Sequence, residues 1–154
     1  MSTAHNRVGV MHGVNFDVLE RRDPDVYGGH SLTELEVRVK HWARERGLEA
    51  QFFQSNSEGE FVEHLHRLPD MADGVIINAG AWTHYSRAIA DALQLAKLPA
   101  VEVHLSDVDA REDWRKVSVF EGMVLAKIAG KGLEGYREAI EVLATELGAA
   151  RPGE

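Results

Sequence analysis

The sequence predicts an α/β fold in which helices cover both faces of a parallel β-sheet. Two observations carry this prediction. Short apolar runs alternate with longer amphipathic segments along the chain, which is the pattern of βαβ units. The run Gly-Val-Ile-Ile-Asn within residues 73–78 is continuously apolar, as in a strand buried on both faces. A chain of 154 residues, 44% of them hydrophobic, fits one catalytic domain over residues 1–154.

Five strands and four main helices follow from these runs. Strands are expected at residues 8–11, 48–54, 73–78, 99–105 and 123–129. Helices are expected from Ser31 to near Gly47, from Ser57 to Pro69, over 86–97 and over 133–147. The first two helices begin at capping boxes, in which the serine bonds the backbone of a glutamate that bonds back. These elements predict a flavodoxin-like three-layer sandwich with the five-stranded parallel sheet in the order 2-1-3-4-5.

The long connection after the first strand is the most unusual segment. Residues 14–30 exceed the usual length of a βα loop, and such loops are often lids. Ligands of this fold bind beyond the carboxyl ends of the strands, so the loops after Met11, Gln54, Ile77 and Leu105 are expected to carry the chemistry. Residues 149–154 are expected to form a loose tail.

Composition excludes several classes of site. The chain contains no cysteine, which rules out disulfides, zinc-thiolate sites, iron–sulfur clusters and thiol nucleophiles. A net charge of −8 disfavours a broad nucleic-acid surface. There is no HExxH motif, P-loop or carboxylate cluster at metal-ligand spacing, so we expect neither a metal nor a cofactor. No apolar run is long enough to span a bilayer, and the polar residues 1–7 favour a cytoplasmic location.

Glu102 and His104 end the fourth predicted strand on one face, because side chains alternate along a strand. A carboxylate beside an imidazole can hold the tautomer of the ring and raise its basicity. The sequence therefore predicts an acid–base pair at the carboxyl edge of the sheet. The alternative is a partly exposed pair of edge residues.

Two further segments contain reactive side chains. In Asn78-Ala-Gly80-Ala-Trp-Thr-His84, an amide, a glycine that lets backbone N–H groups approach a ligand, and a titratable ring follow the third strand. The alternative there is a turn with a helix cap. In the long connection, Arg22 precedes Tyr27 and two glycines, which suits a lid that carries a reactive phenol. The alternative is an exposed basic loop anchored by Tyr27.

Taken together, these segments resemble the type II 3-dehydroquinate dehydratases from about residue 8 to residue 147. Several motifs occur in the order and spacing of that family. They are His-Gly-Val-Asn15, Arg22-Asp-Pro-Asp-Val-Tyr27-Gly, Gln54-Ser-Asn56-Ser-Glu58-Gly, Ile77-Asn78-Ala-Gly80-Ala-Trp-Thr-His84, Glu102-Val-His104-Leu-Ser106 and Arg111-Glu-Asp-Trp-Arg115.

The resemblance implies a cofactor-free lyase of the shikimate pathway, which supplies aromatic amino-acid biosynthesis. Such an enzyme removes water from 3-dehydroquinate to give 3-dehydroshikimate by an anti elimination through an enolate. The resemblance also implies trimers that assemble into a dodecamer, with a small ring carboxylic acid as the only other partner.

The resemblance assigns the chemical steps to residues of the lid and of strand ends. Tyr27 would be the base, with Arg22 and Arg111 favouring its phenolate. Asn15 would position a water or a hydrogen bond at the enolate oxygen. His104, oriented by Glu102, would protonate the departing hydroxyl.

Substrate binding is assigned by the resemblance to a second set of residues. Asn78, in a loop with Gly80, would bind the carboxylate together with the backbone N–H groups of Leu105 and Ser106. His84 and Arg115 would hold the ring hydroxyls. Asp91 would reach the site of a neighbouring subunit.

Departures from the family pattern leave two alternatives open. The usual Asn-Gly-Pro-Asn-Leu-Asn-Leu-Leu-Gly becomes a segment with His12, Val14, Asp17 and Glu20, and the usual tyrosine of the next motif is Trp82. The usual His-His before Ser118 is Lys-Val. One alternative is the same chemistry on a modified cyclohexane carboxylic acid. The other is a non-catalytic oligomeric scaffold of the same fold.

Overall fold

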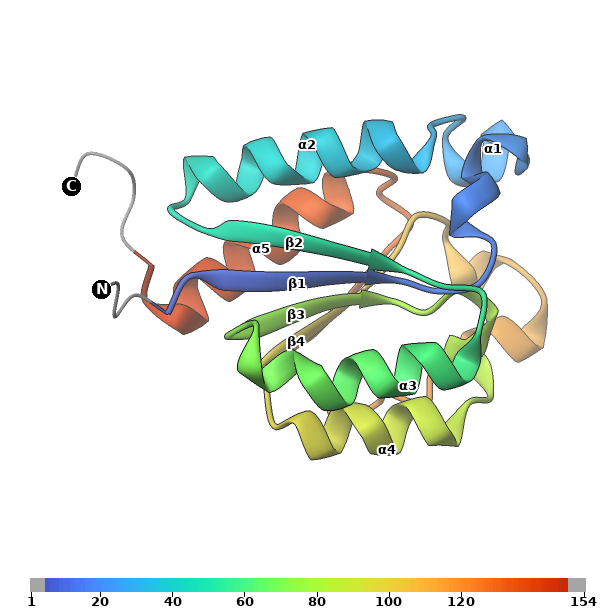
Figure 1. Cartoon of the computed structure of the whole chain (residues 1–154). Helices are drawn as coiled ribbons and strands as arrows, with labels where there is room; N and C mark the ends of the chain where they lie inside the picture. The colour runs from blue at the N-terminus through green and yellow to red at the C-terminus, as the bar shows by residue number, and fades with distance from the viewer. Residues whose placement is uncertain (1–4, 150–154) are drawn as a thin grey trace.

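The computed structural model describes residues 5–149, which form one five-stranded parallel sheet between helices (Figure 1). The strand order is β2-β1-β3-β4-β5, so the predicted fold class and order are confirmed. The strands are β1 (Arg7–His12), β2 (Glu49–Gln54), β3 (Gly74–Asn78), β4 (Ala100–His104) and β5 (Ala126–Ala129).

Two helices pack on each face of the sheet (Figure 1). Helices α2 (Leu32–Glu45) and α5 (Glu134–Leu147) cover one face, and α3 (Glu58–Arg67) and α4 (Arg87–Ala96) cover the other. Successive side chains of a strand point to opposite faces of the sheet, so each strand contributes to the hydrophobic core on both faces. Val10 and Ile76 join the cluster under α2 and α5, whereas Met11 and Ile77 join the cluster under α3 and α4. No helix within residues 5–149 is both long and apolar enough to cross a membrane.

The predicted capping boxes form only in part. The hydroxyl oxygens of Ser31 and Ser57 accept hydrogen bonds from the backbone N–H groups three residues later, at 3.1 and 3.2 Å. The return bond from each glutamate was expected as well. Instead, the Glu34 carboxylate lies 3.3 Å from the His30 ring, and the Glu60 carboxylate accepts a 2.7 Å bond from Ser55.

The connection after β1 is helical, which corrects the prediction of a long loop over residues 14–30. It contains the 3-10 helix η1 (Phe16–Arg21) and the short helix α1 (Pro24–Tyr27). Phe16 and Leu19 are buried in the core cluster under α2 and α5. These two buried side chains hold the segment against the end of the sheet.

Two boundaries also differ from the prediction. Strand β5 begins at Ala126 and not at residue 123, because its pairing with β4 begins at Val101 and the residues before it form a turn with Gly122 at φ +83°. Ala149, assigned to a loose tail, packs against the core and donates its N–H to the Ala144 carbonyl. The rest of that tail, residues 150–154, lies outside the described residues.

Candidate active site

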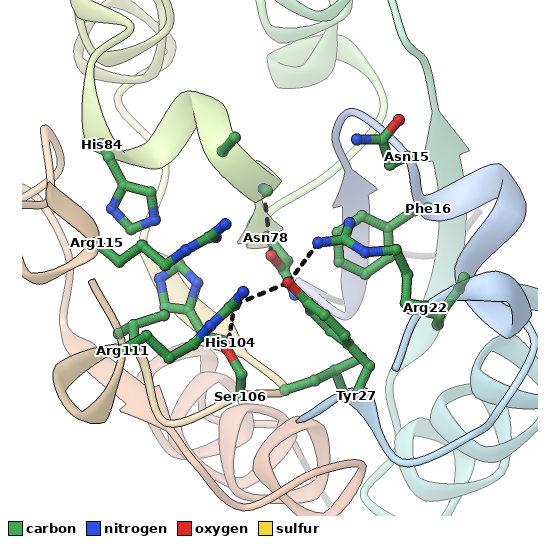
Figure 2. Close-up of a pocket in the computed structure, with 15 residues that line it drawn as sticks. Asn15, Phe16, Arg22, Tyr27, Asn78, His84, His104, Ser106, Arg111 and Arg115 are labelled. Carbon is green, nitrogen blue, oxygen red and sulfur yellow. Dashed lines mark hydrogen bonds between the residues drawn. The ribbon is translucent and has the colours of Figure 1, made fainter. Parts of the chain in front are cut away.

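A cavity of about 130 Å³ opens where the carboxyl ends of β1, β3 and β4 meet the helical segment after β1 (Figure 2). This volume suits a small molecule. The cavity is lined by Asn15, Phe16, Leu19, Arg22, Tyr27, Asn78, Gly80, Ala81, His84, His104, Leu105, Ser106, Val108, Arg111 and Arg115. It therefore brings together most of the residues that the sequence singled out.

Tyr27 is held between two guanidinium groups (Figure 2). Its hydroxyl oxygen accepts hydrogen bonds from Arg22 Nη2 at 2.5 Å and from Arg111 Nη1 at 2.8 Å. The guanidinium carbon of Arg22 also lies 4.2 Å from the centre of the phenol ring. Arg111 is 84 residues away in the sequence, so the fold supplies the second cation. Two charged donors on one oxygen stabilise a negative charge there.

Glu102 and His104 form a buried pair at the end of β4. Their side chains are 1% and 5% exposed, so the alternative of a partly exposed edge pair is wrong. His104 Nε2 lies 2.5 Å from Glu102 Oε2. Because a carboxylate only accepts, Nε2 carries the proton of this bond and Nδ1 is left for a ligand. The second carboxylate oxygen, Oε1, accepts a 2.8 Å bond from the hydroxyl of Ser118.

Asn78 is fixed by partners on both sides of its amide. Its Oδ1 accepts from the backbone N–H of Gly80 at 3.3 Å, and its Nδ2 donates to the hydroxyl of Tyr136 at 3.1 Å. The N–H of Gly80 is thus used within the turn, while the residue itself lines the cavity. Gly80 has φ +63°, and a Cβ there would lie 3.0 Å from the Val14 carbonyl oxygen. The glycine is therefore required by the turn itself.

His84 lies beside His104 in the cavity, with the two ring centres 6.1 Å apart (Figure 2). Its Nδ1 donates to the carbonyl of Val117 at 2.7 Å. Burial, followed by repulsion from His104 and Arg115, lowers the pKa of His84 below its ordinary value. The ring is therefore neutral at neutral pH, with Nε2 as an acceptor.

Arg115 reaches the cavity from the 3-10 helix η5 (Asp113–Lys116). Its Nε donates to Glu112, and its guanidinium carbon lies 4.1 Å from the centre of the Trp114 ring. The hydrogen bond from Arg115 lowers the pKa of the Glu112 carboxyl. These contacts aim a positive charge at the cavity from the side opposite Arg22.

The remaining predicted residues are placed less centrally. Asn15 lines the cavity but is exposed, has φ +73° and uses its backbone N–H to bond Asn56 at 2.8 Å. The hydroxyl of Ser106 accepts from Arg111 at 3.3 Å, beside Leu105. Asp91 lies outside the cavity, exposed on α4.

Sequence reasoning missed four residues that shape the site. Phe16 and Leu19 form apolar walls, and their burial within a segment expected to be a loop gave no signal of its own. Ser118 and Tyr136 are the partners of Glu102 and Asn78. Tyr136 lies in the helix predicted over 133–147, where sequence reasoning assigned it no role in the site. A buried tyrosine needs a hydrogen-bond partner for its hydroxyl, and that requirement could have pointed to it.

The arrangement combines three chemical capacities. A phenol oxygen that accepts from two guanidinium groups faces the cavity from the segment after β1, and an imidazole backed by a carboxylate faces it from β4. Arg22, Arg111 and Arg115 add positive charge, which attracts an anionic ligand. Within residues 5–149, histidine, aspartate and glutamate side chains form no cluster of three or more that could hold a metal ion.

Comparison with known proteins gives a consistent result. The family model described as Dehydroquinase class II matches residues 6–144. A 3-dehydroquinate dehydratase of Syntrophotalea carbinolica is 46% identical over 131 residues, which cover 84% of this chain and 88% of the relative. One of Thermotoga maritima is 43% identical over 141 residues, covering 92% and 96%. The solved structure of a type II dehydroquinase from Propionibacterium acnes superposes with a TM-score of 0.86 at 40% identity, covering 94% and 99%.

Proposed function

The chain belongs to the class II dehydroquinase family, and we propose that it removes water from 3-dehydroquinate to give 3-dehydroshikimate. The observation that carries this proposal is the phenol of Tyr27 bound by two guanidinium groups across one cavity from the His104–Glu102 pair. A base and an acid on different elements suit an elimination in which proton and hydroxyl leave from opposite faces of a ring.

The reaction begins with the Tyr27 phenolate, which takes a proton from the carbon next to the ketone. The electron pair of the broken C–H bond forms an enolate, with Asn15 at its oxygen through a water or a direct hydrogen bond. Collapse of the enolate forms the carbon–carbon double bond and breaks the carbon–oxygen bond. His104, doubly protonated at this step, donates from Nδ1 the proton that turns the departing hydroxyl into water, and Glu102 stabilises the positive ring by its hydrogen bond to Nε2.

Binding is assigned to charges and donors around this pair. Asn78 and the backbone N–H groups of Leu105 and Ser106 bind the carboxylate, while His84 and Arg115 hold ring hydroxyls. These residues line the same cavity, which supports the assignment.

The proposal includes a trimer-based dodecamer, with Asp91 contributing to the site of a neighbouring subunit. Its exposed position on α4 supports this role, since the side chain is free to meet another copy. Sedimentation of the purified chain measures the assembly. Asp91→Ala should lower activity while leaving an assembled particle.

The decisive experiment follows the ultraviolet absorbance of the conjugated enone product. The parent should turn over 3-dehydroquinate, and Tyr27→Phe and His104→Ala should each lower kcat by about 10²- to 10⁴-fold. Tyr85→Phe is the matched control, because Tyr85 is 61% exposed and lies outside the cavity. A Tyr27→Phe enzyme with the parent rate would refute the assignment of the base.

The same assay separates the alternatives. Turnover of a modified ring acid in preference to 3-dehydroquinate would support the same chemistry on another substrate. An assembled particle with no turnover of any ring acid would support a scaffold. The cluster around Tyr27 favours catalysis, because two guanidinium groups converge on one phenol oxygen, an arrangement that packing alone does not require.

A further inference from the structure

A continuous row of hydrogen bonds runs from the active-site turn into the protein core. It links the backbone N–H of Gly80 to Asn78 at 3.3 Å, Asn78 to the Tyr136 hydroxyl at 3.1 Å, and that hydroxyl to His12 Nε2 at 3.1 Å. Tyr136 and His12 are fully buried, and Asn78 is 3% exposed. Of these side chains only Asn78 reaches the cavity (Figure 2), while His12 packs behind Phe16 with ring centres 5.0 Å apart.

The direction of the row is fixed at its Asn78 end. A backbone N–H can only donate, so the atom of Asn78 that it meets is the oxygen, and the nitrogen faces Tyr136. The Tyr136 oxygen accepts from that nitrogen, so its own hydrogen is free to donate to His12 Nε2. His12 is then a neutral acceptor whose proton is on Nδ1. Burial lowers the pKa of His12 to about 3, which agrees with a neutral ring.

Burying the polar groups of this row costs folding free energy, which a role in the active site would explain. A phenylalanine at position 136 would fill much the same volume without a buried hydroxyl to satisfy. Among residues 5–149, His12 Nδ1 has no hydrogen-bond partner, so the imidazole leaves one polar atom unsatisfied in the core. The Tyr136 hydroxyl and the His12 ring both act on Asn78, the side chain of the row that lines the cavity, and this effect on the site accounts for their presence in the core.

We propose that Tyr136, oriented by His12, is a positioning residue that holds Asn78 with its Nδ2 donor available to the cavity. One Nδ2 hydrogen is used by Tyr136, and the other is left for an acceptor on the ligand. This corner of the site therefore offers a donor to an acceptor oxygen of the ligand, and with the proposed function, on which this inference rests, that oxygen belongs to the substrate carboxylate.

Kinetics of Tyr136→Phe, Asn78→Ala and the double variant test this role. A contact made equally in the bound substrate and the transition state affects KM and not kcat. Tyr136→Phe should raise KM about 5- to 10-fold with kcat within about twofold. In the Asn78→Ala background the same substitution should leave KM unchanged, because the group through which Tyr136 acts is gone.

Substitutions of His12 give the matched comparison. His12→Gln keeps an acceptor near the position of Nε2 for the Tyr136 hydroxyl and should retain the parent KM, whereas His12→Leu should raise KM as Tyr136→Phe does. Circular dichroism of each variant checks that the fold is intact. The role is overturned if Tyr136→Phe raises KM by the same factor with and without Asn78, or if it lowers kcat at unchanged KM.

A second measurement needs no activity. The ¹⁵N chemical shifts of the His12 ring should show a neutral imidazole protonated at Nδ1 from about pH 5 to pH 8. A ring protonated at Nε2 would donate to Tyr136 instead of accepting from it, and this would overturn the orienting role of His12. Failure of the proposed function has a different signature, since a parent that turns over no 3-dehydroquinate can still show the expected tautomer of His12.

Discussion

The acid–base residues proposed for the site fall into two groups with different surroundings: Tyr27 in the segment after β1, and the Glu102–His104 pair at the end of β4. Tyr27 is half-buried and meets two cations, so negative charge on its oxygen is stabilised by hydrogen bonds. His104 and Glu102 are almost completely buried, so their charges have each other and Ser118 as partners in place of water. Removing the charge of Glu102 therefore changes how readily His104 holds a proton.

Glu102→Gln tests that coupling. The carboxylate becomes a neutral amide, so the negative charge that stabilises a protonated His104 ring is lost and the ring becomes a poorer proton donor to the ligand. We expect kcat to fall by about 10²- to 10⁴-fold with a small change in KM. Steady-state kinetics at saturating substrate measures the loss.

Glu121→Gln is the control for this substitution, because Glu121 is an exposed glutamate and does not line the active-site cavity. It should retain the parent rate. A Glu102→Gln enzyme as fast as the Glu121→Gln enzyme would show that His104 does not depend on the carboxylate.

The sequence predicted this residue pair more completely than its surroundings. Strand alternation places Glu102 and His104 on one face, and that rule is local. Ser118 comes from a turn 16 residues after Glu102, and Arg111 meets Tyr27 across 84 residues. Contacts of that kind depend on the path of the chain between elements, which hydrophobic periodicity does not specify.

At the scale of elements, the segment after β1 differs most from expectation. Its length and its glycines predicted a lid, but η1 and α1 are too short for a helical period to stand out from the sequence. Gly28 ends α1 at φ +88° and donates its N–H to the Pro24 carbonyl. That left-handed residue sets the course of the chain directly after Tyr27.

Gly28→Ala should therefore disturb the position of α1 and of Tyr27 without unfolding the protein. A side chain at this φ costs about 1 to 2 kcal/mol, and the new Cβ would lie 3.2 Å from the His30 ring. If the strain is relieved by displacing α1, kcat/KM falls about tenfold while the urea midpoint changes little. Both are measured on the same preparation.

Gly148→Ala provides the matched control. Gly148 also ends a helix in the left-handed region, at φ +66°, but it caps α5, where the added Cβ would meet no atom within 4 Å. This variant should have a lower urea midpoint than the parent and the same kcat/KM. Equal losses of activity in the two variants would contradict a specific role for the α1 cap.

For the whole molecule, the order of a parallel sheet is predictable because each βαβ unit is written in the sequence as a short apolar run followed by an amphipathic segment. The buried polar row is not predictable in this way. Tyr136 falls on the apolar stripe of α5, and His12 ends an apolar strand, so each is assigned to the core by its position. Their hydrogen bond joins residues 124 apart and exists only in the folded chain.

That row also gives the folded state a dependence on pH. The pKa of His12 is lowered by burial to about 3 in the folded chain, while an unfolded chain binds the proton near pH 6.5. Between these values the unfolded state holds one more proton at this site, so stability falls as the pH falls. From pH 7 to pH 5 the contribution of His12 to the free energy of unfolding should decrease by about 2 kcal/mol.

His12→Gln removes this titration and keeps an acceptor for Tyr136 near the position of Nε2. Urea unfolding of parent and variant, at one protein concentration and at pH 7, 6 and 5, should show the parent losing about 2 kcal/mol more than the variant over that range. Asp73, whose pKa is lowered chiefly by its hydrogen bond with Arg7, loses its stabilising charge only below about pH 4, outside this window. Parallel pH profiles of the two proteins would mean that His12 is protonated in the folded core, and the ring would then be no acceptor for the Tyr136 hydroxyl.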